Sequence, residues 1–217
     1  MATDVLGRLV EVLSGQALDT FFTEHIFGPL GMEDTSFVVP AAKVHRLVAC
    51  YLGADPADPM KPGLTRSDDY PYPGAYLRPV ARLSGGGGLV SSLPDRVSLV
   101  CSLLPGGPTL LKPGTIELMM QNQLPANVWV QFLDTGVSTG LGHGLAGAMA
   151  VAPVANDPAA QLGEVRWGGI AGTQWWISPR SGIAVLMMAQ RQMAFWHPFS
   201  LEFKRLAYQA MGRGVKA

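Results

Sequence analysis

Charged side chains are scarce in this 217-residue sequence. Asp, Glu, Lys and Arg make up 15% of it, and their formal charges cancel to a net charge of zero. Soluble domains commonly carry about a quarter charged residues. Nucleic acids and anionic membrane surfaces attract proteins through clustered basic residues, and the sequence has no such excess. We therefore expect neither a nucleic acid nor a membrane as partner.

Long apolar runs, a basic leader and metal-ligand spacings are also missing. No apolar stretch approaches the roughly 20 residues that a membrane-spanning helix needs. The N-terminus has no basic region followed by an apolar segment, so we expect no signal peptide and a cytoplasmic protein. We expect no metal and no other cofactor, because no two histidines have a spacing typical of a metal site. The histidines are His25, His45, His143 and His197.

Cysteine is nearly absent. Cys50 and Cys101 are the only two, and neither has a CxxC-type partner. A reduced, buried pair is the default prediction, and a disulfide between them stays open. The chain is long enough for a sizeable core and has no internal repeat and no low-complexity tail. We predict one domain that spans residues 1–217.

Helical periodicity marks five segments. The first two are residues 3–13 and 17–27, and Gly28-Pro29 is the expected end of the second. Three more helices are expected at residues 94–104, 113–121 and 197–211. The apolar face of the first helix consists of Val5, Leu6, Leu9, Val10 and Leu13. The apolar side of the last helix consists of Phe199, Phe203, Leu206, Ala207 and Ala210.

Two extended runs in the last quarter of the chain predict a hairpin in the middle of a sheet. Residues 173–178 (TQWWIS) and 182–189 (GIAVLMMA) are rich in residues that suit strands, and neither contains proline. Residues 179–182 between them have turn chemistry. Because the second run is nearly all apolar, we expect both of its faces to be covered.

Trp167, Gly168 and Gly169 stand at the front of this hairpin. Two residues without a Cβ let a substrate come close to the backbone, and a bare N–H on an edge strand suits a developing oxyanion. A bulge at the start of a strand explains the same glycines equally simply. The local sequence alone favours the bulge.

Two other glycine-rich stretches have different explanations. Ser84 and the four glycines after it are only superficially like a phosphate-binding loop, because no Lys follows at a helix start. Nucleotide binding is therefore disfavoured. Residues 140–146 are expected to form a strand whose glycines let another backbone or a bulky Trp pack closely.

Four segments, in order, resemble the serine β-lactamase and penicillin-binding-protein superfamily, and most of all its family VIII carboxylesterases. The first three segments are residues 25–37 (HIFGPLGMEDTSF), 83–95 (LSGGGGLVSSLPD) and 110–124 (LLKPGTIELMMQNQL). The fourth is the hairpin, where Trp-Gly-Gly stands in place of the Lys-Thr-Gly of β-lactamases. The resemblance implies an α+β, β-lactamase/transpeptidase-like fold in which helices flank an antiparallel sheet.

The resemblance also implies a reaction and a site. The full-length parent is expected to hydrolyse small, short-chain esters through an acyl-serine intermediate. The backbone N–H of Ile170 is implied as half of the oxyanion hole, and Trp167, Gly168 and Gly169 as substrate-binding residues. The absence of Lys-Thr-Gly argues against β-lactamase activity. In the family, residues 38–82 contribute loops around the acyl pocket, which Tyr70, Tyr72 and Tyr76 could line; equally, these aromatics could pin a loop to the core.

The family's nucleophile is missing from this sequence. It is the Ser of Ser-x-x-Lys, and a Tyr-x-Asn or Tyr-Ser-x motif supplies a second proton carrier. None of the 12 serines has Lys three positions on, and no Tyr has Asn two positions on. In family members the Tyr motif directly precedes a helix similar to residues 2–8. We therefore expect this chain to be the C-terminal part of the fold, and to be inactive alone.

A partner is a further expectation. Surfaces that pack against the missing part in the family are exposed in a C-terminal fragment, which favours self-association or binding of the missing N-terminal segment. A non-catalytic pseudoenzyme or partner-binding module stays open as the alternative function. An unrelated fold with His143 or Asp134 as a base is disfavoured, because no Ser/His/Asp set has a suggestive spacing.

Overall fold

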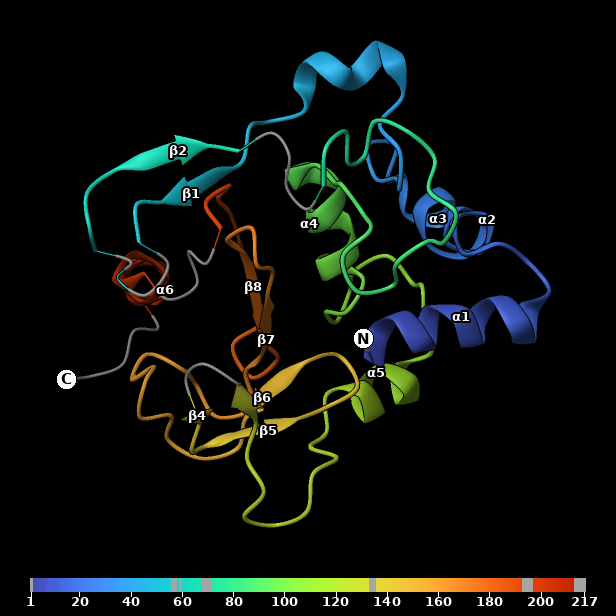
Figure 1. The fold of residues 1–217 in the computed structure, drawn as a ribbon. Coiled ribbons are helices and arrows are strands. Elements are labelled where there is room, and N and C mark those ends of the chain that lie inside the picture. Colours follow the sequence, from blue (N-terminus) through green and yellow to red (C-terminus); the bar gives the residue numbers. More distant parts are fainter. Residues whose placement is uncertain are drawn as a thin grey trace.

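The computed structural model describes residues 2–55, 58, 60–67, 72–132, 136–192 and 197–212. At its centre is an antiparallel sheet of five strands, each hydrogen-bonded to its neighbours along the chain (Figure 1). These strands are β5 (Leu141–His143), β6 (Ala148–Ala150), β7 (Val165–Gly168), β8 (Thr173–Ser178) and β9 (Ile183–Met188). Two small hairpins form sheets of their own. They are β1 (Tyr51–Gly53) with β2 (Leu64–Arg66), and β3 (Gln131–Phe132) with β4 (Gly136–Val137).

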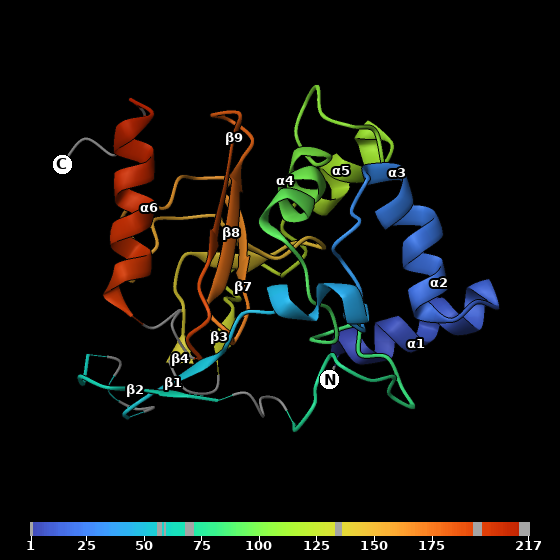
Figure 2. The ribbon, with the colours of Figure 1, turned by 90° about the horizontal axis from the view of Figure 1, so that it is seen from above.

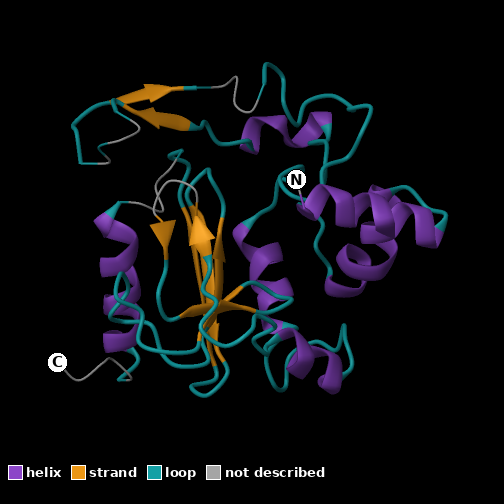
Figure 3. Cartoon of the chain, turned by 60° about the horizontal axis from the view of Figure 1, so that its bottom comes forward, coloured by secondary structure: helices purple, strands orange, loops and turns teal. Residues whose placement is uncertain are grey.

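Helices lie on both sides of the central sheet. The C-terminal helix α6 (Pro198–Ala210) lies on one side, and the other helices lie on the opposite side (Figures 2 and 3). The helices on that opposite side are α1 (Ala2–Ser14), α2 (Leu18–Phe22), α3 (Gly28–Leu30), α4 (Leu93–Cys101) and α5 (Pro113–Met119), with a 3₁₀ helix at Ala41–Arg46. The α+β architecture that the resemblance implied is confirmed.

The predicted hairpin is confirmed almost to the residue, but its place in the sheet is not. β8 pairs with β9 from Thr173 opposite Met188 to Ser178 opposite Ile183. In the described part of the chain, β9 pairs with β8 alone and is therefore an end strand of the sheet. Both faces of β9 are covered, as predicted, by α6 on one side and α4 on the other (Figure 2).

The second helix extends further than the sequence indicated. It begins at Leu18, widens into a π-helical turn over Thr23–Phe27, and continues through α3 to Leu30. The predicted end at Gly28-Pro29 is therefore wrong. The wide turn makes room for the ring of Pro29, which has no N–H that needs an acceptor. The helix ends at Gly31, whose φ of 65° lies in the left-handed region.

The helix predicted at residues 94–104 begins one residue earlier, at Leu93, ends three residues earlier, at Cys101, and has a side-chain cap. The N–H of Asp95 donates to the Ser92 hydroxyl at 3.4 Å. The carboxylate of Asp95 is itself buried and accepts from the Asp34 N–H at 2.8 Å and from the Thr35 hydroxyl at 2.7 Å. The residues that begin α4 therefore also tie it to the segment after α3.

The first helix forms as predicted, but its apolar face points to solvent. Leu6 is 58% exposed, Leu9 47% and Leu13 77%. The opposite face packs on the protein through Asp4 and Gly7. Asp4 accepts hydrogen bonds from the Ser84 hydroxyl and from the Gly86 N–H.

The stretch of four glycines packs against α1 and forms no phosphate loop. A Cβ on Gly85 would lie 2.5 Å from the Thr3 carbonyl oxygen and 3.3 Å from the Gly7 Cα. A Cβ on Gly7 would in turn lie 3.4 Å from the Gly85 backbone. Two backbones meet here at a distance that leaves no room for side chains, and this explains glycine at both positions.

The last helix packs across the sheet as predicted, but with a different face. Its most buried residues are Ser200, Lys204 and Tyr208, while the predicted apolar residues Phe199 and Leu206 are 49% and 48% exposed. The cause is a buried polar cluster, which a purely apolar pattern does not reveal. Phe203 and Ala207, which were also predicted, do contact the core.

That cluster joins α6 to β7 and to the loop before it. The Lys204 ammonium lies 2.7 Å from Asp157 Oδ2 and also bonds Glu164. The Tyr208 hydroxyl donates to Glu164 Oε2 at 2.6 Å, and Arg166 of β7 pairs with Asp157. Burial, together with the Glu164 carboxylate, raises the pKa of the Tyr208 phenol far above its usual value. All of these charges are compensated, as buried charges must be.

Candidate functional site

The residues predicted to bind substrate lie at the tip of the hairpin formed by β7 and β8. The Gly169 N–H donates to the Thr173 carbonyl at 2.7 Å, and the Gly172 N–H donates to the Gly169 carbonyl at 2.9 Å. Gly172 has a φ of 93°. This is a β-turn closed by a left-handed residue, a common way to connect two antiparallel strands. Ile170 is the first of the two central residues of the turn.

One edge of this hairpin is open. β6 pairs with β7 only at Val165 and Arg166. Before that pair the chain turns away, because the Gly144 N–H bonds the Gly147 carbonyl. In the described residues, β7 therefore has β8 as its only partner strand from Trp167 onward.

The Ile170 N–H is a free donor beside that edge. Among the described residues, no acceptor bonds it, and the Ile170 side chain is 46% exposed. Its orientation is held by the two hydrogen bonds of the turn and by the ladder to β8. A fixed, unpaired N–H of this kind can donate a hydrogen bond to a developing oxyanion without rearrangement.

Trp167, in the same hairpin three residues before Ile170, is 41% exposed. Its indole meets the imidazole of His143 edge to face, with ring centroids 5.4 Å apart. His143 comes from β5. Of the two partners predicted for the glycines of this segment, it is another backbone that approaches, because a Cβ on Gly144 would lie 2.6 Å from the Met119 carbonyl oxygen. The sequence did not single out His143 as this neighbour, because its position next to Trp167 depends on the turn between β5 and β6.

Different contacts explain why glycine stands at positions 168 and 169. A Cβ on Gly169 would lie 2.6 Å from the Thr173 hydroxyl, so Gly169 is required by the hairpin itself. A Cβ on Gly168 would meet only β8, at 3.3 Å or more. The hairpin turn therefore accounts for Gly169, while Gly168 leaves the open edge of β7 without a side chain.

The tyrosines of residues 38–82 differ in their surroundings. Tyr76 pins the loop, because its hydroxyl donates to the Gly87 carbonyl at 3.1 Å and its own carbonyl accepts from the Val39 N–H at 2.7 Å. Tyr72 is 40% exposed. Tyr70, like Asp134, lies outside the described residues. Neither Tyr72 nor Tyr76 lines the hairpin tip.

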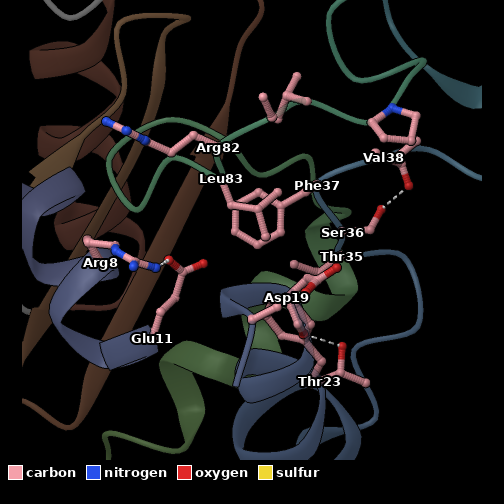
Figure 4. Close-up of a pocket in the computed structure, with 15 residues that line it drawn as sticks. Arg8, Glu11, Asp19, Thr23, Thr35, Ser36, Phe37, Val38, Arg82 and Leu83 are labelled. Atoms are coloured by element: carbon pink, nitrogen blue, oxygen red, sulfur yellow. Dashed lines mark hydrogen bonds and ion pairs between the residues drawn. The ribbon is translucent and has the colours of Figure 1, made fainter. Parts of the chain in front are cut away.

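One hollow of the surface lies away from this edge. It has a volume of about 770 Å³ and is bounded by α1, α2 and residues 79–83 (Figure 4). Its polar groups bond to one another: Arg8 pairs with Glu11 at 2.8 Å, and the Thr23 hydroxyl donates to the Asp19 carbonyl at 2.7 Å. The second hollow, about 490 Å³, lies among residues 153–162. Neither is lined by residues 167–170.

No activated nucleophile is assembled in the described ranges. None of their serine hydroxyls is hydrogen-bonded to a lysine ammonium or a histidine ring. The same ranges contain no cluster of three potential metal ligands and no helix with the length and apolarity of a membrane span. Cys50 and Cys101 are free, half-buried thiols, so the predicted disulfide alternative does not occur. The hairpin tip thus presents an unpaired backbone N–H and an exposed indole, and no activated nucleophile is assembled in the described ranges.

Comparisons with known proteins agree with the fold. The family model described as Beta-lactamase matches residues 1–197. Protein Rv1367c of Mycobacterium tuberculosis is 29% identical over 87% of this chain and 47% of its own length, and Esterase EstB of Burkholderia gladioli is 28% identical over 87% and 48%. Among solved structures, "EstCE1, a hydrolase with promiscuous acyltransferase activity", has a TM-score of 0.78 and 26% identity over 95% of this chain and 55% of its own. The chain spans about half the length of the relatives that it matches.

Proposed function

Because this chain belongs to the Beta-lactamase family, we propose that it supplies one wall of the active site of a serine esterase or acyltransferase. In this proposal the nucleophilic Ser and the Lys and Tyr proton carriers come from the half of the fold that lies outside this chain. The reaction is acyl transfer from a small, short-chain carboxylic ester to that Ser, and from the Ser to water or an alcohol.

The observation that carries the proposal is the free N–H of Ile170 at the open edge of β7. When a serine oxygen attacks an ester carbonyl, the carbonyl oxygen becomes an oxyanion that needs donors already in place. Ile170 supplies one such donor, and the backbone N–H of the nucleophile itself supplies the other in the proposed site. The bare backbone at Gly168 lets the ester carbonyl come close.

Trp167 determines which acyl groups fit. Its exposed indole is a flat apolar wall beside the donor, and His143 holds one of its edges. The nearest cation on the same strand, Arg166, is engaged with Asp157 and does not serve a substrate carboxylate. These features favour an uncharged acyl group and disfavour the carboxylate of a β-lactam.

The names of relatives support the same class. Esterase EstB is an esterase by its name, and EstCE1 is described as a hydrolase with promiscuous acyltransferase activity. A second candidate, a non-catalytic protein that binds a partner, is favoured by one observation: none of the 12 serines lies in a Ser-x-x-Lys motif.

Reconstitution separates the two candidates. The family half that carries Ser-x-x-Lys is taken from the source genome, purified, and mixed with this chain. Hydrolysis of p-nitrophenyl butyrate is then measured for each part and for the mixture. The proposal predicts turnover only in the mixture. A stable complex of both parts that hydrolyses neither this ester nor an acyl thioester would make the non-catalytic alternative correct.

A further inference from the structure

The turn between β5 and β6 lies directly against Trp167. A Cβ on Gly147 would lie 3.5 Å from the Trp167 Cβ and 2.7 Å from the Arg166 carbonyl oxygen. His143, at the other end of the turn, meets the Trp167 indole edge to face, with ring centroids 5.4 Å apart. Because β6 gives Trp167 no ladder partner, contact with this turn takes the place of strand pairing there.

The segment after α5 holds the turn in place through the backbone. The His143 N–H donates to Asn122 Oδ1 at 3.0 Å, and the His143 carbonyl accepts from the Gln123 N–H at 2.8 Å. The Ala146 N–H donates to the Met119 carbonyl at 3.3 Å. None of these bonds uses the imidazole. The His143 side chain can therefore be changed without releasing the turn.

The contact of the His143 imidazole is with the indole. Within the described ranges, none of its ring nitrogens is hydrogen-bonded or ion-paired to another residue. An edge-to-face pair of rings favours one relative orientation over the others. The Trp167 side chain is 41% exposed, so without this contact other staggered rotamers are open to it.

From this geometry we propose that His143 is the positioning residue of Trp167 and that it restricts the site to short acyl groups. The inference rests on the proposed function, because Trp167 is the proposed acyl wall. The imidazole touches no reacting atom in this proposal. It fills the space beside the indole and keeps the wall upright. When the imidazole is removed, the indole turns into the vacated space and a longer acyl chain gains room.

The first measurement uses the 217-residue chain alone. His143→Ala and His143→Asn both remove the aromatic ring, whereas His143→Phe keeps a ring that has no proton to exchange. His45→Ala is the matched control, because His45 is exposed on the 3₁₀ helix. Near-ultraviolet circular dichroism reports fixed aromatic packing. Each spectrum is recorded with and without Trp167→Phe, and the difference isolates Trp167 from the other four tryptophans.

The expected result is a loss of at least half of the Trp167 signal in His143→Ala and His143→Asn. His143→Phe and His45→Ala should keep the signal, and all four variants should keep the far-ultraviolet spectrum. The second measurement is the ratio of kcat/KM for p-nitrophenyl butyrate to that for p-nitrophenyl octanoate in the reconstituted mixture. We expect the ratio to fall at least fivefold when the ring is removed and to be restored by His143→Phe.

An unchanged Trp167 signal in the two variants without the ring would overturn the inference, and so would an unchanged ester ratio. If His143→Phe keeps the signal but loses turnover of both esters, His143 exchanges a proton with the substrate and the positioning role is wrong. A mixture without any turnover would refute the proposed function and the acyl restriction together. The spectra of the chain alone would still decide whether His143 positions Trp167.

Discussion

Lys204 Nζ lies 2.7 Å from Asp157 Oδ2, and the side chains of both residues are almost fully buried. Because Glu164 shares the same ammonium, removing the Lys204 charge leaves two buried carboxylates, Asp157 and Glu164, to the single guanidinium of Arg166. Such a loss commonly costs about 3–5 kcal/mol. We therefore predict that Lys204→Met lowers the free energy of unfolding by that amount in urea titrations. Arg205→Met is the control, because its ion pair with Glu202 is half-exposed. Equal, small effects of both substitutions would contradict this account.

The raised pKa of the Tyr208 phenol predicts how the stability of the protein changes at alkaline pH. In the folded protein its pKa is raised, whereas the unfolded chain ionises near the ordinary value of about 10. The stabilisation is therefore complete below pH 10 and is lost as pH rises above it, because the unfolded state releases its proton first. Wild-type stability should fall more steeply between pH 10 and 11.5 than that of Tyr208→Phe. Parallel slopes for the two proteins would rule out this role.

The contact between Gly85 and α1 can be tested with two alanines. Gly85→Ala places a Cβ 2.5 Å from the Thr3 carbonyl oxygen, whereas a Cβ on Gly87 meets nothing within 4 Å. We expect Gly85→Ala to lower the free energy of unfolding by about 1–3 kcal/mol through overpacking. Gly87→Ala should change it little. Should Gly85→Ala prove as stable as Gly87→Ala in thermal melts, the close packing of α1 would be disproved.

The oxyanion role of Ile170 can be tested at its N–H alone. Ile170 occupies the first central position of a β-turn, where proline fits. Ile170→Pro therefore removes the donor while keeping the turn, and Ile170→Ala keeps the donor while shortening the side chain. In the reconstituted enzyme, the proline variant should lose about 100- to 1000-fold in kcat, the usual effect of losing one oxyanion donor. If the alanine variant loses as much as the proline variant, the side chain and not the N–H is what matters.

How far the sequence predicted this structure depends on the kind of contact. The β8–β9 hairpin was predicted to within one residue, because strand-favouring residues and a turn sequence are local signals. The face of α1 was predicted correctly as apolar, but its exposure was not, since periodicity does not say which side of a helix meets the protein. The true contact is backbone on backbone at Gly7 and Gly85, 78 positions apart, and only the fold brings these residues together.

Local sequence patterns were equally unable to show which distant residues contact α6 and the site. The apolar pattern of α6 selected Phe199 and Leu206, but the buried face contains Lys204 and Tyr208, whose partners Asp157 and Glu164 are more than 40 residues away. At the site, the resemblance identified Trp167, Gly168, Gly169 and Ile170 together, and they remain a prediction of function. The sequence had no local signal for His143 as the neighbour of Trp167.

The central claim is that the nucleophile lies outside this chain. It is tested most directly by incubating the purified 217-residue chain with a fluorophosphonate probe, measuring its intact mass, and assaying p-nitrophenyl butyrate hydrolysis on the same sample. If the nucleophile lies outside this chain, the mass stays unmodified and hydrolysis does not exceed the rate in buffer. A stoichiometric serine adduct together with turnover would show that the chain carries its own nucleophile and would contradict the account.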